Sequence, residues 1–311
     1  MKYLSITFFL MFVFFGYLSL FTFNEQHIPN CPYLSGDSLR SHCDFVFDEV
    51  RSFNAADIQK PAIIFVTTHY LDRFFKEKHP EVKFPYVLVT HNSDEPVPGS
   101  FAEYLDDPKL LHWFGQNPSL AGHPKFSPIP IGIANQFWPH GRKEIFDQAI
   151  KRSSRIAKKH LFYINFSIPV GNSVDETWAM YQKERVAVSN KFSKQPFTYT
   201  GPRKSSADYL DDLAASYFVA SPRGHGLDCH RTWEALLMGA YPVVKTSPLD
   251  SVYADLPVII INDWADITEE FLKAKYAELS VKQWSCEKLY AQYWIDKIRA
   301  TARRNLLKNQ L

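Results

Sequence analysis

The sequence lacks the features that mark several large classes of protein. Its 35 lysine and arginine residues are balanced by 33 acidic ones, for a formal net charge of +2, so no excess of positive charge would attract nucleic acid. Its 4 cysteines have no C-x-x-C spacing and no histidine partners in a zinc-binding pattern. The signatures G-x-x-x-x-G-K-[ST] and G-x-G-x-x-G are also missing, which argues against a P-loop or a dinucleotide-binding fold.

The cysteines leave two alternatives open. Cys31 and Cys43 are close enough in sequence to form a disulfide if the compartment is oxidising. Unpaired, buried thiols are the other possibility.

Long apolar runs are missing too, with one exception at the N-terminus. Tyr3 to Phe23 holds 21 residues without a charge, which as a helix would reach about 31 Å, enough to cross a bilayer core. No A-x-A-like cleavage site follows. The sequence therefore predicts a signal anchor over 1–24, with a cleaved signal peptide as the alternative. Lys2 would keep the short tail in the cytoplasm and place the rest in a Golgi- or ER-type lumen or a bacterial envelope.

The remainder has the apolar content of a packed protein, and 311 residues suit two domains. Continuous apolar runs of strand length recur at 62–70, 86–92, 111–117, 129–135, 160–166, 197–201, 217–224, 240–246 and 258–263. Such runs are typical of strands covered on both faces, hence of parallel sheets with crossover helices. We expect an α/β fold of two Rossmann-like βα domains facing a central cleft, because ligands of such sheets bind beyond the carboxyl ends of the strands.

The expected boundaries follow from these runs. After the anchor come a stem and the start of the N-terminal domain, with a helical pattern at 43–53, then two βα domains and a helical tail that packs back. These segments are 25–60, 61–155, 156–275 and 276–311.

One segment combines glycines with many charged side chains. Residues 221–244, SPRGHGLDCHRTWEALLMGAYPVV, read as a strand end, a loop, a helix and the next strand. Asp228 is expected to cap the helix and Gly239 to follow its last turn. The helix N-terminus would then point out of the carboxyl edge of the sheet, where free amides and nearby Arg223 favour a phosphate.

Glu234 follows Asp228 by six residues, within the first two turns of this helix. A carboxylate there is misplaced for a phosphate but well placed to accept both hydroxyls of a ribose. A basic loop for a diphosphate together with one acid for a ribose indicates a nucleotide. The competing interpretation is a salt bridge between Arg223 and Glu234 that only tethers the loop to the helix.

The stretch FVASPRGHGLDCHRTWEALLMGAYPVV resembles the C-terminal core of exostosin-type glycosyltransferases in its Pro-Arg-Gly turn, following arginine, Glu-Ala-Leu helix and Pro-Val strand. The match covers about 209–268. The resemblance implies the GT-B fold, a membrane anchor and sugar transfer from a nucleotide-sugar donor, with Arg223 on the diphosphate and Glu234 on the ribose. The residues expected to bind the nucleotide sugar are Arg223, Gly224, His225, Asp228, His230, Arg231, Glu234 and Lys245.

The acceptor and the catalytic base are expected in the N-terminal domain. The strand in YVLVTHNSDEPVPG ends in polar groups, among which His91, Asp94 and Glu95 are candidate catalytic residues; the alternative is an ordinary turn. Asn117, Asn135 and Asn165 end other strands and are expected to line the cleft, although Asn165 also lies in an N-x-[ST] sequon. Trp113, Trp138 or Trp178 could stack on a sugar, although most of the 7 tryptophans are expected in the core.

These patterns together predict a membrane-anchored glycosyltransferase acting on a glycan or glycoconjugate acceptor. The chain contains no D-x-D motif, so we expect a metal-independent reaction with no cofactor, and inversion at the sugar follows from the resemblance. Two alternatives remain: a fucosyltransferase-like GT-B enzyme that uses a GDP-sugar, and a non-catalytic, membrane-tethered carbohydrate-binding protein.

Overall fold

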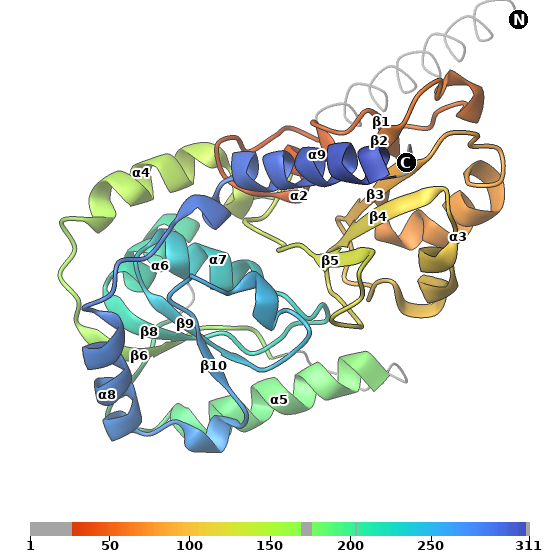
Figure 1. Ribbon diagram of the computed structural model, residues 1–311. Coiled ribbons are helices and arrows are strands. Elements are labelled where there is room, and N and C mark those ends of the chain that lie inside the picture. The colour runs from red at the N-terminus through yellow and green to blue at the C-terminus, as the bar shows by residue number, and fades with distance from the viewer. Residues whose placement is uncertain (1–26, 169–175, 203, 309–311) are drawn as a thin grey trace, which may run out of the picture.

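The computed structural model describes residues 27–168, 176–202 and 204–308, which form two five-stranded parallel sheets (Figure 1). The first sheet has the order β1-β2-β3-β4-β5 and the second the order β10-β9-β8-β6-β7. The predicted α/β class is therefore confirmed. The strands are β1 Phe45–Phe47, β2 Ala62–Thr67, β3 Tyr86–His91, β4 Leu110–Gly115, β5 Phe126–Pro128, β6 His160–Ile164, β7 Thr198–Thr200, β8 Ser216–Ala220, β9 Tyr241–Lys245 and β10 Ile259–Ile261.

Helices connect and cover these strands. The α-helices are α2 Gly36–Arg40, α3 Leu71–Arg73, α4 Lys143–Ser153, α5 Glu176–Phe192, α6 Ser206–Ala214, α7 His230–Leu237, α8 Glu269–Leu279 and α9 Ala291–Lys308. A π-helical segment, η3 Phe74–Lys78, continues α3. The 3-10 helices are η1 Ala55–Asp57, η2 Thr68–Tyr70, η4 Gly99–Asp106, η5 Pro139–Gly141, η6 Asp250–Val252, η7 Trp264–Asp266 and η8 Glu287–Leu289.

The membrane anchor predicted for 1–24 lies outside the described residues. Within 27–168, 176–202 and 204–308, no helix has the length and apolar character needed to cross a bilayer.

Both faces of the first sheet are covered, which explains its continuous apolar runs. On one face, side chains such as Ile64 and Leu88 pack with Phe74 of the crossover segment. On the other face, Ile63 and Val87 belong to the same core as α9, and this C-terminal helix lies along the first sheet (Figure 1). The last helix of the chain thus completes the N-terminal domain.

Two expectations about this domain are wrong. The segment 43–53 is not helical, because Phe45–Phe47 pairs with β2 as a parallel edge strand. The run 129–135 is not a strand: the sheet ends with β5, Pro130 has no N–H to donate, and Gly132 has a φ of +68° with its backbone against Leu34. This run is instead the extended crossing to the second domain.

The second sheet reverses its strand order between β6 and β8. Strand β6 has β7 as its neighbour on one side and β8 on the other, and β9 and β10 lie beyond β8. Such a switch point leaves a crevice beyond the carboxyl ends of the two central strands. Helices α5 and α8 cover one face of this sheet, and α4, α6 and α7 cover the other.

Helix α7 ends as predicted but begins differently. Gly239 follows its last turn, and Ala240 N donates to Ala235 O at 2.9 Å, which closes the C-terminus as a Schellman motif. At the other end Cys229 occupies the N-cap position without a side-chain capping bond. Asp228 therefore does not cap α7, because its carboxylate is used elsewhere.

The Asp228 carboxylate connects the two domains. It is 3% exposed and accepts hydrogen bonds from Ile131 N, Trp233 Nε1 and Cys229 N, each at 2.8 Å. Burial raises its pKa to about 6, although these donors lower it. The backbone N–H of Asp228 also donates to Asn117 Oδ1 at 3.0 Å, so the start of α7 is bonded to two segments of the first domain.

The cysteines are free thiols in the structure, and Cys31 and Cys43 do not form a disulfide. Cys31 is exposed, whereas burial raises the pKa of Cys43.

Replacing Asp228 with alanine should lower the free energy of unfolding by about 3 kcal/mol, because buried donors on Ile131 and Trp233 would lose their acceptor. Urea denaturation of the full-length chain measures the change. Tyr253→Phe is the matched control: it removes only the longer 3.4 Å contact to the same carboxylate, and we expect less than about 1 kcal/mol. Equal effects of the two changes would contradict the role given to Asp228.

Candidate functional site

A cavity of about 900 Å³, called the large cavity below, lies at the switch point of the second sheet. Its walls come from the segment after β6, the loop between β8 and α7, and α5 and α6, and Asp94 closes it from the first domain. This large cavity is where a ligand of a parallel sheet is expected. Of the predicted residues, those that line it are Asp94, Asn165, Gly224, His225, Asp228, His230, Arg231 and Glu234.

Two arginines form the cationic wall of the large cavity. The guanidinium groups of Arg185 and Arg231 lie over the ring of Phe166, 5.7 and 5.3 Å from its centroid. Both guanidinium groups donate mainly to backbone carbonyls, such as Arg185 Nε to Arg223 O and Arg231 Nε to Asn165 O. Arg231 Nη1 is buried without a hydrogen-bond partner in the described part of the chain.

Neither Arg185 nor Arg231 forms an ion pair with a carboxylate among the described residues. Burial lowers the pKa of Arg185, so holding this charge away from water is costly. Arg231 also lies in the first turn of α7, where the unpaired amides of a helix add partial positive charge. An anionic ligand would offset the cost of burying the Arg185 charge and would also be attracted by the positive charge at the start of α7.

Arg185 was not among the predicted site residues, although the sequence carries a signal for it. Along α5, Tyr181, Arg185, Val188 and Phe192 recur at helical spacing, and all four are buried. A single arginine in an otherwise apolar stripe is a charge that the fold must bury. Lys204 and Tyr209, which also line the large cavity, had no comparable signal.

Glu234 faces the large cavity from the second turn of α7. It is 7% exposed and accepts a hydrogen bond from Tyr209 Oη at 3.0 Å. Burial raises its pKa, while this hydrogen bond and the charge of Arg231 lower it. The alternative in which Arg223 and Glu234 form a tethering salt bridge is wrong, since the described structure pairs Glu234 with Tyr209 and directs Arg223 elsewhere.

Arg223 and Lys245 do not line the large cavity. Both lie on a separate cavity of about 240 Å³ beside β9. The Arg223 side chain turns back on its own loop, with Nη2 donating to His225 O at 3.2 Å, and Lys245 is exposed at the end of β9. The expectation that Arg223 and Lys245 bind the same ligand as Glu234 is therefore wrong, because neither residue lines the large cavity.

The loop before α7 is pressed against the first domain. A Cβ on Gly226 would lie 2.8 Å from both Asn117 Nδ2 and Asp94 Oδ1, so only glycine allows this approach. His230 Nδ1 lies 2.8 Å from Gly132 O, and burial lowers the pKa of His230 to about 4. His230 is thus a neutral group that joins the domains.

The three candidate catalytic residues occupy different environments. His91 is 2% exposed; its Nε2 donates to Pro130 O, its Nδ1 accepts from Asn92 N, and burial lowers its pKa. Both ring nitrogens are thus used within the fold. Glu95 is exposed and lines neither cavity of the site. Asp94 has a side chain that is 53% exposed, and it approaches His225 Nδ1 at 3.7 Å.

A second cavity of about 420 Å³ adjoins the large one, and we call it the small cavity. The two share Asp94, Ile131 and His230 in their walls, so Asp94 lies at their junction. Asn135, which was expected in the cleft, also lines the small cavity, and so does Trp138, one of the three tryptophans considered for stacking on a sugar. Trp113 is instead buried in the core, and the side chain of Trp178 lies outside the described part of the structure. Asn117 instead lies 1% exposed behind the site, bonded to Asp228.

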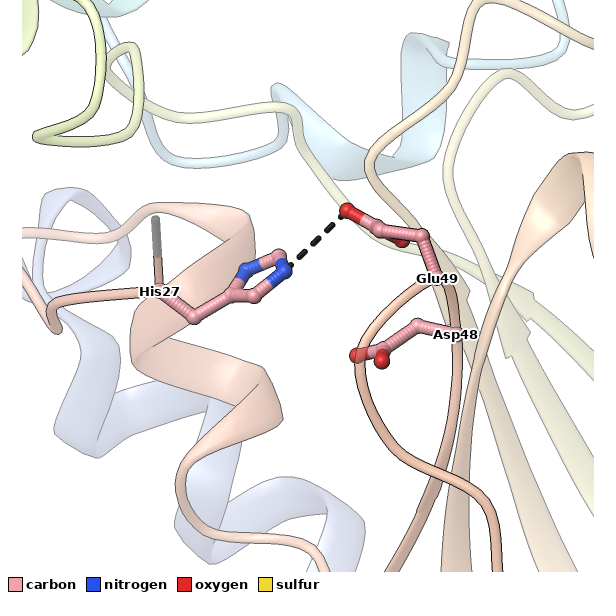
Figure 2. Close-up of side chains that lie close together, drawn as sticks. All are labelled: His27, Asp48 and Glu49. Carbon is pink, nitrogen blue, oxygen red and sulfur yellow. Dashed lines mark hydrogen bonds and ion pairs between the residues drawn. The ribbon is translucent and has the colours of Figure 1, made fainter. Parts of the chain in front are cut away.

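A charged cluster contributes His27 and Glu49 to the wall of the small cavity, and Figure 2 shows these two side chains together with Asp48. His27, Asp48 and Glu49 bring one possible metal-ligand atom each within 4.8 Å of one another. His27 Nδ1 lies 2.8 Å from Asp37 Oδ1, and His27 Nε2 lies 3.1 Å from Glu49 Oε1. Burial lowers the pKa of His27, but the two carboxylates raise it to about 9. Asp48 is bonded to Arg40 at 2.6 Å, so the donor set suits an imidazolium held by carboxylates better than a metal, which requires a neutral imidazole.

Comparisons with known proteins add no identification. No protein-family model matches the chain, and no curated protein matches it.

The His27 cluster predicts a pH dependence of stability. Since the folded pKa of about 9 lies above the ordinary value of 6.5, the stability that His27 contributes is complete below about pH 6.5 and is lost as the pH rises through 9. Chemical denaturation between pH 6 and 10 should show His27→Asn least stable relative to wild type at pH 6, with the difference shrinking toward pH 10. His42→Asn, which removes a histidine in contact with Ser41 Oγ and Ser38 O, is the matched control, and the same convergence in this variant would contradict the assignment. A difference for His27→Asn that stays constant over this range would contradict the assignment.

Proposed function

We propose that this protein is a glycosyltransferase of the exostosin type, with a GT-B-like arrangement of two Rossmann-like domains. The large cavity would bind a nucleotide-sugar donor, and the small cavity would bind a glycan or glycoconjugate acceptor. The apolar run at 3–23 is the proposed membrane anchor. The observation that carries the proposal is a pair of arginines without carboxylate partners among the described residues, placed at a sheet switch point beside the buried Glu234. Arg185 is buried, and Arg231 is half-buried with a buried Nη1 that lacks a partner in the described part of the chain.

The donor's groups match the walls of the large cavity. Its diphosphate would lie at the start of α7, between the side chains of Arg185 and Arg231. The negative charge of the diphosphate would pair with these two arginines, which have no carboxylate partner among the described residues. Glu234 would accept hydrogen bonds from the ribose hydroxyls, and Tyr209 Oη already holds its carboxylate in place at 3.0 Å. Arg223, assigned to the diphosphate by the resemblance, is replaced in this proposal by Arg185.

Asp94 is the proposed general base. Its carboxylate would take the proton from an acceptor hydroxyl, whose oxygen forms a bond to the anomeric carbon of the donor. The bond from that carbon to the β-phosphate oxygen breaks, its electron pair stays on the phosphate, and a nucleoside diphosphate leaves. Attack from the side opposite the leaving group inverts the anomeric centre. The two arginines and α7 would stabilise the charge on the leaving group, a task that D-x-D enzymes give to a metal.

Glu234→Ala should weaken nucleotide binding by about a hundredfold, because the ribose hydroxyls lose a charged acceptor. Thermal-shift titration of the full-length chain with UDP and GDP, with and without chelator, measures it. Glu103→Gln changes an exposed carboxylate that lines neither cavity and should leave binding unchanged.

The nucleotide panel also separates the alternatives. Stabilisation by GDP alone would favour the fucosyltransferase-like enzyme. If neither nucleotide binds and only glycans do, the carbohydrate-binding alternative holds and the proposed transferase is wrong.

Asp94→Asn should reduce kcat by about 10² to 10⁴ while the affinity for the nucleotide stays as in wild type, because only the proton acceptor is lost. The neighbouring Glu95→Gln is the matched control and should retain activity, since Glu95 is exposed outside both cavities. Donor consumption and product formation at saturating nucleotide sugar report the effect. Full activity in Asp94→Asn would remove Asp94 as the base.

A further inference from the structure

The small cavity contains an unusual pair of exposed aromatic rings. Phe137 and Trp138 are 52% and 53% exposed, and their centroids lie 5.3 Å apart at an interplanar angle of 73°. The backbone around them is held in place: Gly141 N donates to Trp138 O at 2.8 Å, and Asn30 Nδ2 donates to Gly141 O at 2.6 Å. Large apolar surface at a concave site indicates a ligand with an apolar face.

Another part of the lining is polar, and its side chains are hydrogen-bonded to one another. Asn135 Nδ2 donates to Asn92 Oδ1, and Asn92 Nδ2 donates to Asp37 Oδ1, both at 3.0 Å. Asn92 N also donates to Gln116 Oε1 at 3.1 Å. Asn92 has a φ of 61°, a conformation that few residues other than glycine adopt. Amides held in this way next to aromatic rings suit a ligand that has hydroxyls along its edge and C–H groups on its face, which is the chemistry of a sugar ring.

The charge of the lining limits which sugar fits. No lysine or arginine is among the residues that line the small cavity in the described chain. Its formal charges are the carboxylates of Glu49 and Asp94 and the imidazolium of His27, which both Asp37 and Glu49 already neutralise. The net field is therefore negative, and a carboxylate, sulfate or phosphate on the ligand would be repelled.

We propose that the small cavity binds a neutral sugar residue, stacked on Trp138 and hydrogen-bonded by Asn92, Asn135 and Glu49, and that it rejects acidic sugars. This inference rests on the proposed function for its role as the acceptor site, because the wall shared at Asp94 would place a sugar hydroxyl near the proposed base. The binding itself requires only the small cavity.

The test uses neutral and acidic sugars of matched shape. Saturation-transfer NMR of the full-length chain with methyl glucoside and methyl galactoside, each paired with its uronic acid, compares the two classes. The neutral member of at least one pair should bind, and its acid should bind about tenfold more weakly. Trp138→Ala should lower the affinity by about tenfold or more, and Trp138→Tyr should restore most of it. Glu49→Gln should reduce the difference in affinity between a neutral sugar and its uronic acid, because it removes a negative charge from the lining.

Phe84→Ala is the matched control, since Phe84 is an exposed aromatic residue, 37% accessible, that lines neither cavity. The inference is overturned if no neutral sugar binds, if an acid binds as tightly as its neutral partner, or if Trp138→Ala behaves like the control. Nucleotide titration of the same samples separates the two proposals. Sugar binding that depends on Trp138 without nucleotide binding would refute the transferase and leave the sugar site standing.

Discussion

The candidate site depends on one buried carboxylate. Asp228 takes N–H donors from the crossing segment at Ile131 and from Cys229 and Trp233 at the start of α7. Burying this charge is unfavourable, as its raised pKa shows, and the donors offset that cost only while all of them are in place. The carboxylate thereby sets the position of the α7 N-terminus relative to the first domain, and both cavities take their shape from that position.

The charges around the large cavity follow a common pattern. Burial raises the pKa of Glu234 and lowers that of Arg185, so the fold holds each group against its preference for water. Such groups cluster at binding sites, because a ligand of complementary charge gains more from them than from charges already screened by solvent. Arg231 follows the same pattern, since its Nη1 is buried and has no hydrogen-bond partner among the described residues.

The strands of the two sheets could be predicted from the sequence more completely than the residues of the candidate site. Apolar runs predicted eight of the strands, and in central strands such as β2 and β3 the cause is burial on both faces. The run 129–135 failed because Pro130 and Gly132 take an equally apolar segment out of the sheet. Helix α7 and Glu234 were predictable from local spacing. The side-chain direction of Arg223, which turns back to His225 O, and the arrival of Arg185 from a different helix are tertiary facts that no local pattern contains.

The connections between the domains argue for a preformed site rather than one that closes around its ligand. Asp228 accepts a hydrogen bond from Ile131 N and donates its own N–H to Asn117, and His230 contacts Gly132 O. These contacts join the start of α7 to the first domain, and α9 returns the chain to the first sheet. A hinge between the domains would have to break the buried hydrogen bonds of Asp228, which costs more than the rearrangement of an exposed loop. A ligand entering these cavities meets groups already in position, and affinity gained in this way comes from avoiding reorganisation rather than from additional contacts.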